Sequence, residues 1–421
     1  MILGPQAADS VRHAGRPSTQ RACGRPLASR VITVIASTDR DVAAHGRSAR
    51  WPYVAAGASA LLAAVYLSVW GSRYGLDLKV YRNSLTLWRS RQDPYLATLA
   101  GSRLSFTYPP FALLALSPLT WASFPVTQWL LWTASIASAT VSVVLVLRDR
   151  GFDVNHRLWC GAFSWACISI IILEPARSDI DYGQIGLVLM LIAAADLLAI
   201  PSPYRGIAVG FAAAVKLTPL VFVIAFLVRR DVKSASRALA SFAACTLFSW
   251  LLWPALPRVY WDHVLTHPAR VGQIAFGGNQ SWYAILHRPP FPTAGSTAAW
   301  LLLSLATLAV SGFVAWHAER ANRHASAMIS IALAGLLISP VSWTHHWVWV
   351  LLIPPLIMGH REPEVPRAVQ AALWGVVALT VAAPYWWFSS GIPADVFDAL
   401  LTVFTAGSLA VWAAASPRRG I

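Results

Sequence analysis

The stretch from 54 to 82, VAAGASALLAAVYLSVWGSRYGLDLKVYR, decides the fold. Its first part, Val54 to Trp70, is an apolar run without a charged residue. Its length is close to the roughly 20 residues with which a helix crosses a bilayer. The second part places a carboxylate, Asp77, just beyond the end of that run. This arrangement predicts a membrane-spanning helix that is followed by a polar segment at the membrane surface.

Asp77 is the first catalytic candidate because acids are scarce in this chain. The composition is 57% hydrophobic and only 12% charged, whereas soluble domains carry about 25% charged residues. Lys79 and Arg82 flank the carboxylate, so the alternative is a surface aspartate that pairs with one of these two cations. Asp77 alone does not decide between the two interpretations.

Apolar runs of similar length recur along the chain and predict an all-α polytopic membrane protein of about twelve transmembrane helices. Basic residues, such as Arg47 and Arg50 before the first run, mark inner ends and place both termini inside. The piece from 111 to 119 is too short to cross and is predicted to be an interfacial helix on the outer surface. The other runs cover 125–147, 158–173, 184–200, 206–228, 238–253, 298–316, 325–340, 344–358, 367–388 and 396–415.

Residues 1–50 do not follow this pattern. They are rich in Arg, Ala and Ser, which predicts a disordered basic cytoplasmic tail before one transmembrane domain over 51–421. The formal net charge of +15 would also suit nucleic acid, but in a membrane protein basic loops that face anionic lipid explain it, and no nucleic-acid partner is expected. The four cysteines show neither metal-binding nor disulfide spacing.

The apolar run from 206 to 228 is interrupted by Lys216-Leu217-Thr218-Pro219, and basic residues stand at both of its ends. If both ends lie inside, the segment is a hairpin of two short helices with Lys216 at its outward tip. Irregular backbone at such a depth must be buried in protein or line a wet cavity. The alternative is one kinked span with a lysine that reaches toward the surface.

With this topology, the polar motifs collect on the outer face. They are Asp77-Leu78-x-Val80-Tyr81, Phe106-Thr107-Tyr108-Pro109-Pro110, Glu174 to Gln184, Lys216-Leu217-Thr218-Pro219, Asn279-Gln280-Ser281-Trp282 and Ser339 to Trp347. Basic residues of the first outer loop, including Arg82, break the usual inward bias of positive charge and suggest an anionic ligand there. The motifs together predict one site.

The residue types of this site indicate its chemistry. Lys216, Arg82 and Arg177 suit a phosphate leaving group, and carboxylates and histidines suit proton transfer with a hydroxyl. Asp179-Ile180-Asp181 offers two oxygen ligands, which is weak evidence for a divalent ion, so no metal is expected. His345 and His346 are adjacent, and on a helix their side chains point about 100° apart, which disfavours joint metal ligation.

These motifs, with Asp181-Tyr182-Gly183-Gln184 and Ser339-Pro340-x-Ser342-Trp343-Thr344-His345-His346 among them, resemble those of glycosyltransferase family 87. That family comprises actinobacterial polyprenol-phosphate-mannose-dependent α-mannosyltransferases with the GT-C fold. The resemblance spans roughly 52–415. It implies an inverting transfer of mannose, usually through an α-1,2 linkage, from polyprenol-phosphate-mannose to a lipid-linked mannoside, on the outer face of the plasma membrane and without a cofactor or nucleotide sugar. The acceptor is left open among phosphatidylinositol mannoside, lipomannan, lipoarabinomannan and another glycolipid.

The resemblance also implies site residues. The catalytic aspartate of the family falls on Asp77, and its histidine motif falls on His345 and His346. Asp179 does not match the family pattern, which further weakens the case for a bound metal ion. The expected substrate-binding residues are Lys216, Arg82, Tyr81, Tyr108, Arg177, Asp181, Gln184, Asn279, Gln280, Trp282 and Trp343.

Two other classes of protein compete with a transferase. A secondary transporter would show symmetry-related repeats and ionisable residues near the bilayer midplane. The sequence shows no convincing repeat, and its polar residues are mainly on the outer face, with Lys216 the ambiguous one. A non-catalytic scaffold would not need so many polar motifs on one face.

Overall fold

A computed structural model describes residues 50–71, 75–96, 98, 104–288, 296–358 and 367–386. Within these ranges the chain is helical, without a named strand and with two isolated bridges, Thr98–Ser105 and Asn279–Trp343. The all-α prediction is therefore confirmed for the described part. The predicted tail, except Arg50, and the predicted last span at 396–415 lie outside the described residues.

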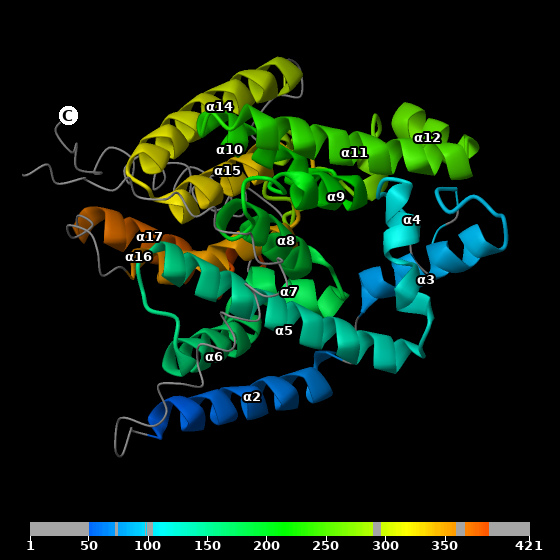
Figure 1. Cartoon of the computed structure of the whole chain (residues 1–421). Helices are drawn as coiled ribbons and strands as arrows, with labels where there is room; N and C mark the ends of the chain where they lie inside the picture. The colour runs from blue at the N-terminus through cyan, green and yellow to red at the C-terminus, as the bar shows by residue number, and fades with distance from the viewer. Residues whose placement is uncertain are drawn as a thin grey trace, which may run out of the picture. The chain divides into compact units, whose positions relative to one another are not determined.

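Long helices alternate with short ones (Figure 1). The helices before the midpoint are α2 (Trp51–Val69), α3 (Leu76–Arg89), α4 (Phe111–Ala115), η4 (Ser117–Thr120), α5 (Phe124–Asp149), α6 (His156–Ile172), α7 (Glu174–Tyr182), α8 (Gly186–Leu198) and α9 (Ile207–Val215). The later ones are η5 (Thr218–Val221), α10 (Phe222–Val228), α11 (Val232–Leu252), α12 (Ala255–Val259), η6 (Tyr260–Val264), η7 (Pro268–Val271), α13 (Trp282–Ile285), α14 (Ser296–Arg320), α15 (His324–Ile338), η8 (Thr344–Leu352), α16 (Ile353–Ile357), α17 (Arg367–Ala382) and η9 (Pro384–Trp386).

Four described helices, α2, α5, α11 and α14, are long and apolar enough to cross a membrane, and the pair α6–α7, bent by 81°, would make a fifth. The prediction of about twelve spans is thus not confirmed. Several predicted runs form shorter or irregular helices: the run at 344–358, for example, is a 3₁₀ helix followed by α16. That run is apolar because it is buried among α5, α7, α8 and α15. The predicted interfacial piece is helical, as α4 and η4, but its interfacial position stays a prediction.

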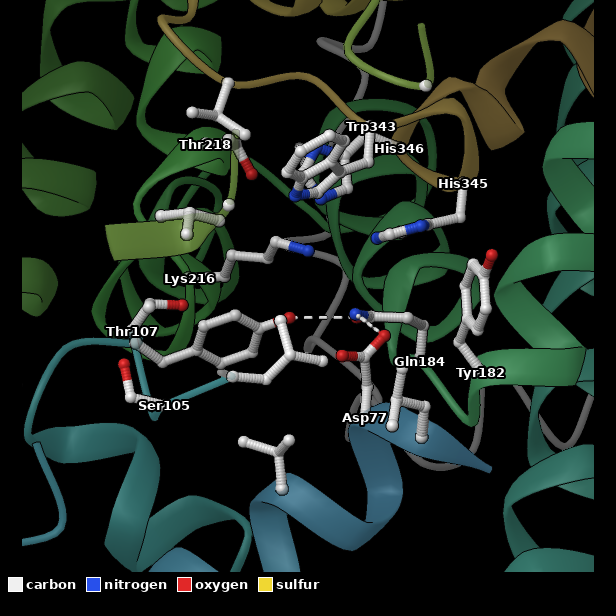
Figure 2. A pocket seen from close by; sticks show the side chains of 18 of the residues that line it. Asp77, Ser105, Thr107, Tyr182, Gln184, Lys216, Thr218, Trp343, His345 and His346 are labelled. Carbon is white, nitrogen blue, oxygen red and sulfur yellow. Dashed lines mark hydrogen bonds between the residues drawn. The ribbon is translucent and has the colours of Figure 1, made fainter. Parts of the chain in front are cut away.

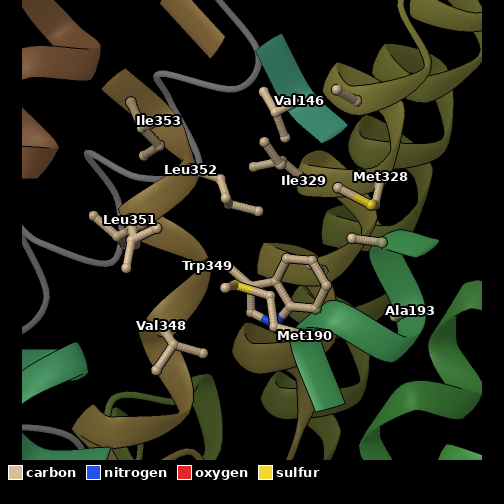
Figure 3. Packing of buried hydrophobic residues seen from close by; sticks show 14 of the residues in the cluster. Val146, Met190, Ala193, Met328, Ile329, Val348, Trp349, Leu351, Leu352 and Ile353 are labelled. Carbon is tan, nitrogen blue, oxygen red and sulfur yellow. The ribbon is translucent and has the colours of Figure 1, made fainter. Parts of the chain in front are cut away.

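The core lies where α5, α8, α15 and η8 meet. Val146, Met190, Met328, Ile329 and Leu352 interlock there and are almost completely buried (Figure 3). By contrast, α2 and α14 carry large exposed apolar side chains, which need a hydrocarbon surrounding. The helices that surround the core therefore have the apolar surface of a membrane protein.

The segment 206–228 is a hairpin. Its start runs along α11, since Gly206 lies against Ser234 and Gly210 against Ala238. Its end returns to the start of α11, where Asp231 lies 3.8 Å from Arg205 at the other end of the segment. The two ends therefore lie together and Lys216 is at the tip, which confirms the hairpin and excludes a single kinked span.

The opposite end of the bundle from this tip carries a separate polar network. Glu319 accepts hydrogen bonds from Arg229 Nε (2.7 Å) and His324 Nδ1 (2.6 Å), and Asp149 accepts one from the backbone N–H of Ala325 at the start of α15. A carboxylate that accepts from the first N–H groups of a helix satisfies donors that have no partner within the helix. These bonds connect the ends of α5, α10 and α14 to one another through the start of α15.

Candidate active site

Five of the six predicted outer-face motifs, all except Asn279-Gln280-Ser281-Trp282, contribute residues to one cavity of about 510 Å³ (Figure 2). Its walls come from α3, the segment 104–109, the turn between α7 and α8, the hairpin tip, the segment 260–278, the segment 341–346 and Trp386 of η9. Eight of the predicted site residues line it: Asp77, Tyr81, Tyr108, Gln184, Lys216, Trp343, His345 and His346. The structure thus brings together residues that are up to 269 positions apart in the chain.

Asp77 is held at the cavity wall by the start of α3. The helix begins after Gly75, whose φ of +53° suits glycine, and the Gly75 N–H donates to the Asp181 carbonyl at 2.7 Å. Asp77 therefore stands in the first helical turn, where the helix dipole favours a carboxylate. Its Oδ2 accepts a hydrogen bond from Gln184 Nε2 at 2.7 Å.

Gln184 joins Asp77 to two tyrosines. Its Oε1 accepts from the hydroxyl groups of Tyr81 (2.7 Å) and Tyr108 (2.9 Å), and those two hydroxyl oxygens are 2.8 Å apart. Two O–H donors on one end of the amide leave only the NH₂ end to face Asp77, so the orientation of the amide is fixed. Gly183 permits this approach, because its φ is +69° and a Cβ there would be 2.8 Å from Leu78 Cβ.

The environment makes Asp77 a stronger base than an ordinary aspartate. Removal from water by the surrounding protein raises its pKa to about 6, while the Gln184 hydrogen bond and the charge of Lys216 partly oppose the rise. The carboxyl group is only partly exposed, and what exposure it has opens into the cavity. A carboxylate with this pKa is ionised at neutral pH and accepts a proton more readily than a typical surface aspartate.

Lys216 supplies positive charge to the same cavity. The residue is 9% exposed, and its Nζ lies 5.0 Å from the centre of the Tyr108 ring. Lys216 forms no ion pair with a carboxylate in the part of the chain that the structure describes. Figure 2 shows its ammonium group directed between the Asp77 side and the two histidines. A buried, unpaired ammonium group is costly unless an anion joins it.

The histidines complete the side of the cavity that faces Lys216. Their rings are perpendicular, 4.6 Å apart, and His345 also packs edge-on against Tyr182 at 5.5 Å. His345 Nε2 and His346 Nδ1 are buried without a hydrogen-bond partner among the described residues. Buried polar nitrogens of this kind cost free energy that a bound ligand can recover.

Six predicted substrate-binding residues do not line the cavity and have other partners. Arg82 donates to the carbonyls of Leu119 and Ala122 and so fastens α3 to η4. Asn279 bonds the backbone of Pro340 and Ser342, which shapes the segment before Trp343. The others are Gln280, bonded to Gly277, Trp282, bonded to Thr307, Asp181, bonded to Tyr66, and Arg177, which lies near Asp181. Their substrate contacts stay predictions.

The Asp-x-Asp pattern does not form one ligand set. Asp179 Oδ2 faces the backbone N–H of Leu187 at 3.5 Å, at the start of α8, and Asp181 accepts from the Tyr66 hydroxyl at 2.9 Å. Among the described residues there is no group of three or more His, Cys, Asp or Glu side chains that could hold a metal ion.

Glu174 is a residue whose role the sequence reasoning missed. It is 1% exposed, and its carboxylate accepts from Ser178 Oγ (2.6 Å), Thr344 Oγ1 (2.9 Å), Tyr385 OH (2.5 Å) and Trp386 Nε1 (3.1 Å). The sequence feature that could have indicated this role is its position: Glu174 is an acid that follows the apolar run of α6 with no cation next to it. Its partners connect α7, η8 and η9 behind the cavity.

Comparisons with known proteins identify the family of the chain. The sequence profile of glycosyltransferase family 87 matches residues 106–340. The chain is 32% identical, over 83% of its length and 88% of the relative, to a polyprenol-phosphate-mannose-dependent alpha-(1-2)-phosphatidylinositol mannoside mannosyltransferase of Mycobacterium tuberculosis. A Mycolicibacterium smegmatis protein with the same name is 32% identical, over 74% of this chain and 76% of its own.

A further relative in M. smegmatis, named as a phosphatidylinositol pentamannoside mannosyltransferase with the same donor dependence, is 34% identical over 69% of this chain and 70% of its own. No solved structure was found to match the chain. Asp77 lies before the region that the profile matches, and the histidine pair lies after it. The profile covers more than half of the chain and the identity to the relatives extends well beyond it, so the chain belongs to glycosyltransferase family 87 and is a glycosyltransferase.

Proposed function

We propose that this protein transfers mannose from polyprenol-phosphate-mannose to a hydroxyl group of a phosphatidylinositol mannoside and forms an α-(1→2) linkage with inversion. The observation that carries the proposal is the cavity in which a basic carboxylate, Asp77, faces a buried ammonium group, Lys216. A hydroxyl nucleophile and a phosphate leaving group need this pair of charges. The printed names of the relatives supply the donor and the class of acceptor.

In the proposed reaction, Asp77 accepts the proton of the acceptor hydroxyl while that oxygen bonds to the anomeric carbon of the donor mannose. The bond between the anomeric carbon and the phosphate oxygen breaks, and polyprenyl phosphate leaves with the electron pair. One displacement from the face opposite the leaving group inverts the anomeric configuration, and no enzyme nucleophile is required. General-base help of this kind contributes about 10²–10⁴-fold to the rate.

Lys216 and the histidines form the side of the site that receives the phosphate. The ammonium group offsets the charge that develops on the leaving oxygen, and this stabilisation is strong because the group is already buried and oriented. His345 and His346 line the same cavity, and their unpartnered nitrogens, His345 Nε2 and His346 Nδ1, can form hydrogen bonds with a bound phosphate or sugar hydroxyl. Gln184 holds the Asp77 carboxylate in place.

The reaction is proposed to occur on the outer face of the plasma membrane. The cavity lies at one end of the helices, and the network of Arg229, Glu319 and His324 lies at the other. Basic residues such as Arg229, Arg230 and Arg237 gather near that second end. By the positive-inside rule, we infer that the basic end faces the cytoplasm and that the cavity faces outward.

The test uses purified protein in lipid nanodiscs with mannose-labelled polyprenol phosphate and a phosphatidylinositol mannoside. Transfer should occur from this donor and not from GDP-mannose. Asp77→Asn should lower transfer by about 10²-fold or more, because the amide cannot take the proton, while the matched exposed variant Asp262→Asn should stay active. Absence of transfer to every phosphatidylinositol mannoside offered would refute the function. Normal turnover of Asp77→Asn would refute the base assignment alone.

A further inference from the structure

Three aromatic rings from distant parts of the chain form a wall on one side of the cavity. Phe276, Trp343 and Trp386, together called the aromatic wall, all line it. The centres of the Phe276 and Trp343 rings are 6.1 Å apart, and those of Phe276 and Trp386 are 5.8 Å apart. Phe276 is 48% exposed and Trp386 42% exposed, so the wall extends to the mouth of the cavity.

Backbone pairing fixes two of the three rings relative to each other. The Thr344 N–H donates to the Gly278 carbonyl at 2.9 Å, and the Gln280 N–H donates to the Ser342 carbonyl at 2.8 Å, on either side of the isolated bridge between Asn279 and Trp343. The segment that carries Phe276 is thereby bound to the segment that carries Trp343. Aromatic side chains on such fixed backbones lose little further freedom when a ligand binds.

The buried carboxylate of Glu174 fixes the third ring. It accepts the indole N–H of Trp386 at 3.1 Å and the hydroxyl of Thr344, the neighbour of Trp343, at 2.9 Å. Glycine keeps the surface of the wall clear, since a Cβ at Gly278 would lie 3.0 Å from the Phe276 ring and 3.1 Å from the Trp386 ring. The wall is therefore a built surface rather than a chance group of exposed rings.

The direction of the Trp386 indole argues against a simple membrane anchor. Tryptophans of the interfacial belt combine an apolar body with a polar N–H that reaches the wet headgroup region. The Trp386 N–H instead points inward to Glu174, and the free part of the side chain at the cavity is its apolar ring. Such a ring face suits the slightly positive C–H groups of a pyranose.

We propose that the aromatic wall binds the mannose residues of the acceptor glycan and so selects acceptors that already carry mannose. This inference rests on the proposed function. The donor brings a single mannose, whereas the wall offers three successive rings, which suits a glycan of more than one sugar. Asp77 and Lys216 then act on the reacting hydroxyl and the phosphate, and the wall holds the sugars that do not react.

The experiment compares two probes in nanodiscs: a short-chain phosphatidylinositol mannoside with at least two mannoses, and short-chain phosphatidylinositol without mannose. Binding of each is measured directly, and acceptor KM and donor KM are measured in the transfer assay. Phe276→Ala and Trp386→Ala should weaken binding of the mannoside and raise the acceptor KM by about tenfold, a typical loss for an aromatic anchor. Binding of phosphatidylinositol and the donor KM should not change.

Two further variants separate ring contact from fold and from membrane anchoring. Trp386→Phe keeps a ring and should retain most mannoside binding. Trp121→Ala removes a tryptophan that is 76% exposed and lies outside the cavity, so binding of both probes should be unchanged. The assignment would be overturned if Trp386→Ala weakened binding of both probes equally, or if it weakened binding of neither. The wild-type protein could also bind the mannoside selectively, through the aromatic wall, and yet transfer no mannose. That result would refute the proposed function but would leave the assignment of the wall intact.

Discussion

Replacement of Gln184 by leucine should move the acid limb of the pH–rate profile to higher pH. In the proposed mechanism the limb reports the ionisation of Asp77, because only the ionised carboxylate can take the acceptor proton. In the wild-type protein the pKa of Asp77 is raised to about 6, and the 2.7 Å hydrogen bond from Gln184 opposes that rise. Loss of the donor therefore raises the pKa further.

The size of the shift follows from the strength of that one bond. A hydrogen bond to a charged group is worth about 1.5–3 kcal/mol, and one pKa unit corresponds to about 1.36 kcal/mol. Asp77 is partly exposed to the cavity, where water can replace part of the lost bond, so the lower end of the range applies. The limb should move by about one unit, which lowers the ionised fraction at pH 6 about fivefold and hardly changes it at pH 8.

The assay is labelled-mannose transfer at a series of pH values, with kcat/KM taken at each. Gln128→Leu is the matched control, because Gln128 is a buried glutamine that donates to the Gly71 carbonyl at 3.1 Å and does not line the cavity. A Gln184→Leu profile that is lower at every pH, with its limb at the wild-type position, would show that Gln184 does not act through Asp77. An equal shift in Gln128→Leu would point to a general structural effect.

Four further predictions concern the rest of the site. Lys216→Met should raise the donor KM more than the acceptor KM, because the lost charge faces phosphate; equal changes in both would contradict this. His345→Ala and His346→Ala should impair transfer to different extents, since their rings are perpendicular; identical kinetics would show that they act as one unit. Transfer should continue in excess EDTA, and loss that added Mg²⁺ or Mn²⁺ restores would reveal a metal. In a background without native cysteines, Lys79→Cys should react with an impermeant reagent from outside and Arg230→Cys should not.

Much of the cavity was predictable from sequence because each motif adjoins the end of an apolar run. Alternation of such ends brings Asp77, Lys216 and His345 to the same side of the helices, and the structure places all three in one cavity. The hairpin was equally readable from its basic ends and its interrupted centre. These predictions needed only the direction in which the chain crosses, which local charge and hydropathy encode.

Some residues were assigned to the site but do not line it. Whether a helical residue lines the cavity depends on which face of its helix is turned inward. Tyr81 is four residues after Asp77 in α3, about 40° around the helix, whereas Arg82 is about 140° around it. Arg82 consequently donates to the Leu119 carbonyl in η4, and Tyr81 lines the cavity. Glu174 was missed for another reason, since its partners Thr344 and Tyr385 are 170 and 211 residues away in the chain.

The number of spans could not be read from apolar length alone. The segment 344–358 is as apolar as a membrane helix, yet it is an irregular helix enclosed by other helices. Burial in protein and burial in lipid both select apolar side chains, so composition does not separate them. Of the aromatic wall, Trp343 alone was predicted from the sequence, because Phe276 and Trp386 meet it only through backbone pairing and a shared carboxylate.

The close packing of α9 on α11 makes the protein sensitive to substitution at Gly210, a position that does not line the cavity. A Cβ at Gly210 would lie 2.2 Å from the Ala238 carbonyl oxygen, so even alanine must push α9 away from its neighbour. Lys216 is six residues further on, about 9 Å along the same helix direction. A substitution at Gly210 is therefore expected to lower transfer by displacing the Lys216 charge, and a second change that restores transfer is best sought at Ser241, whose Cβ would lie 2.7 Å from the new Cβ.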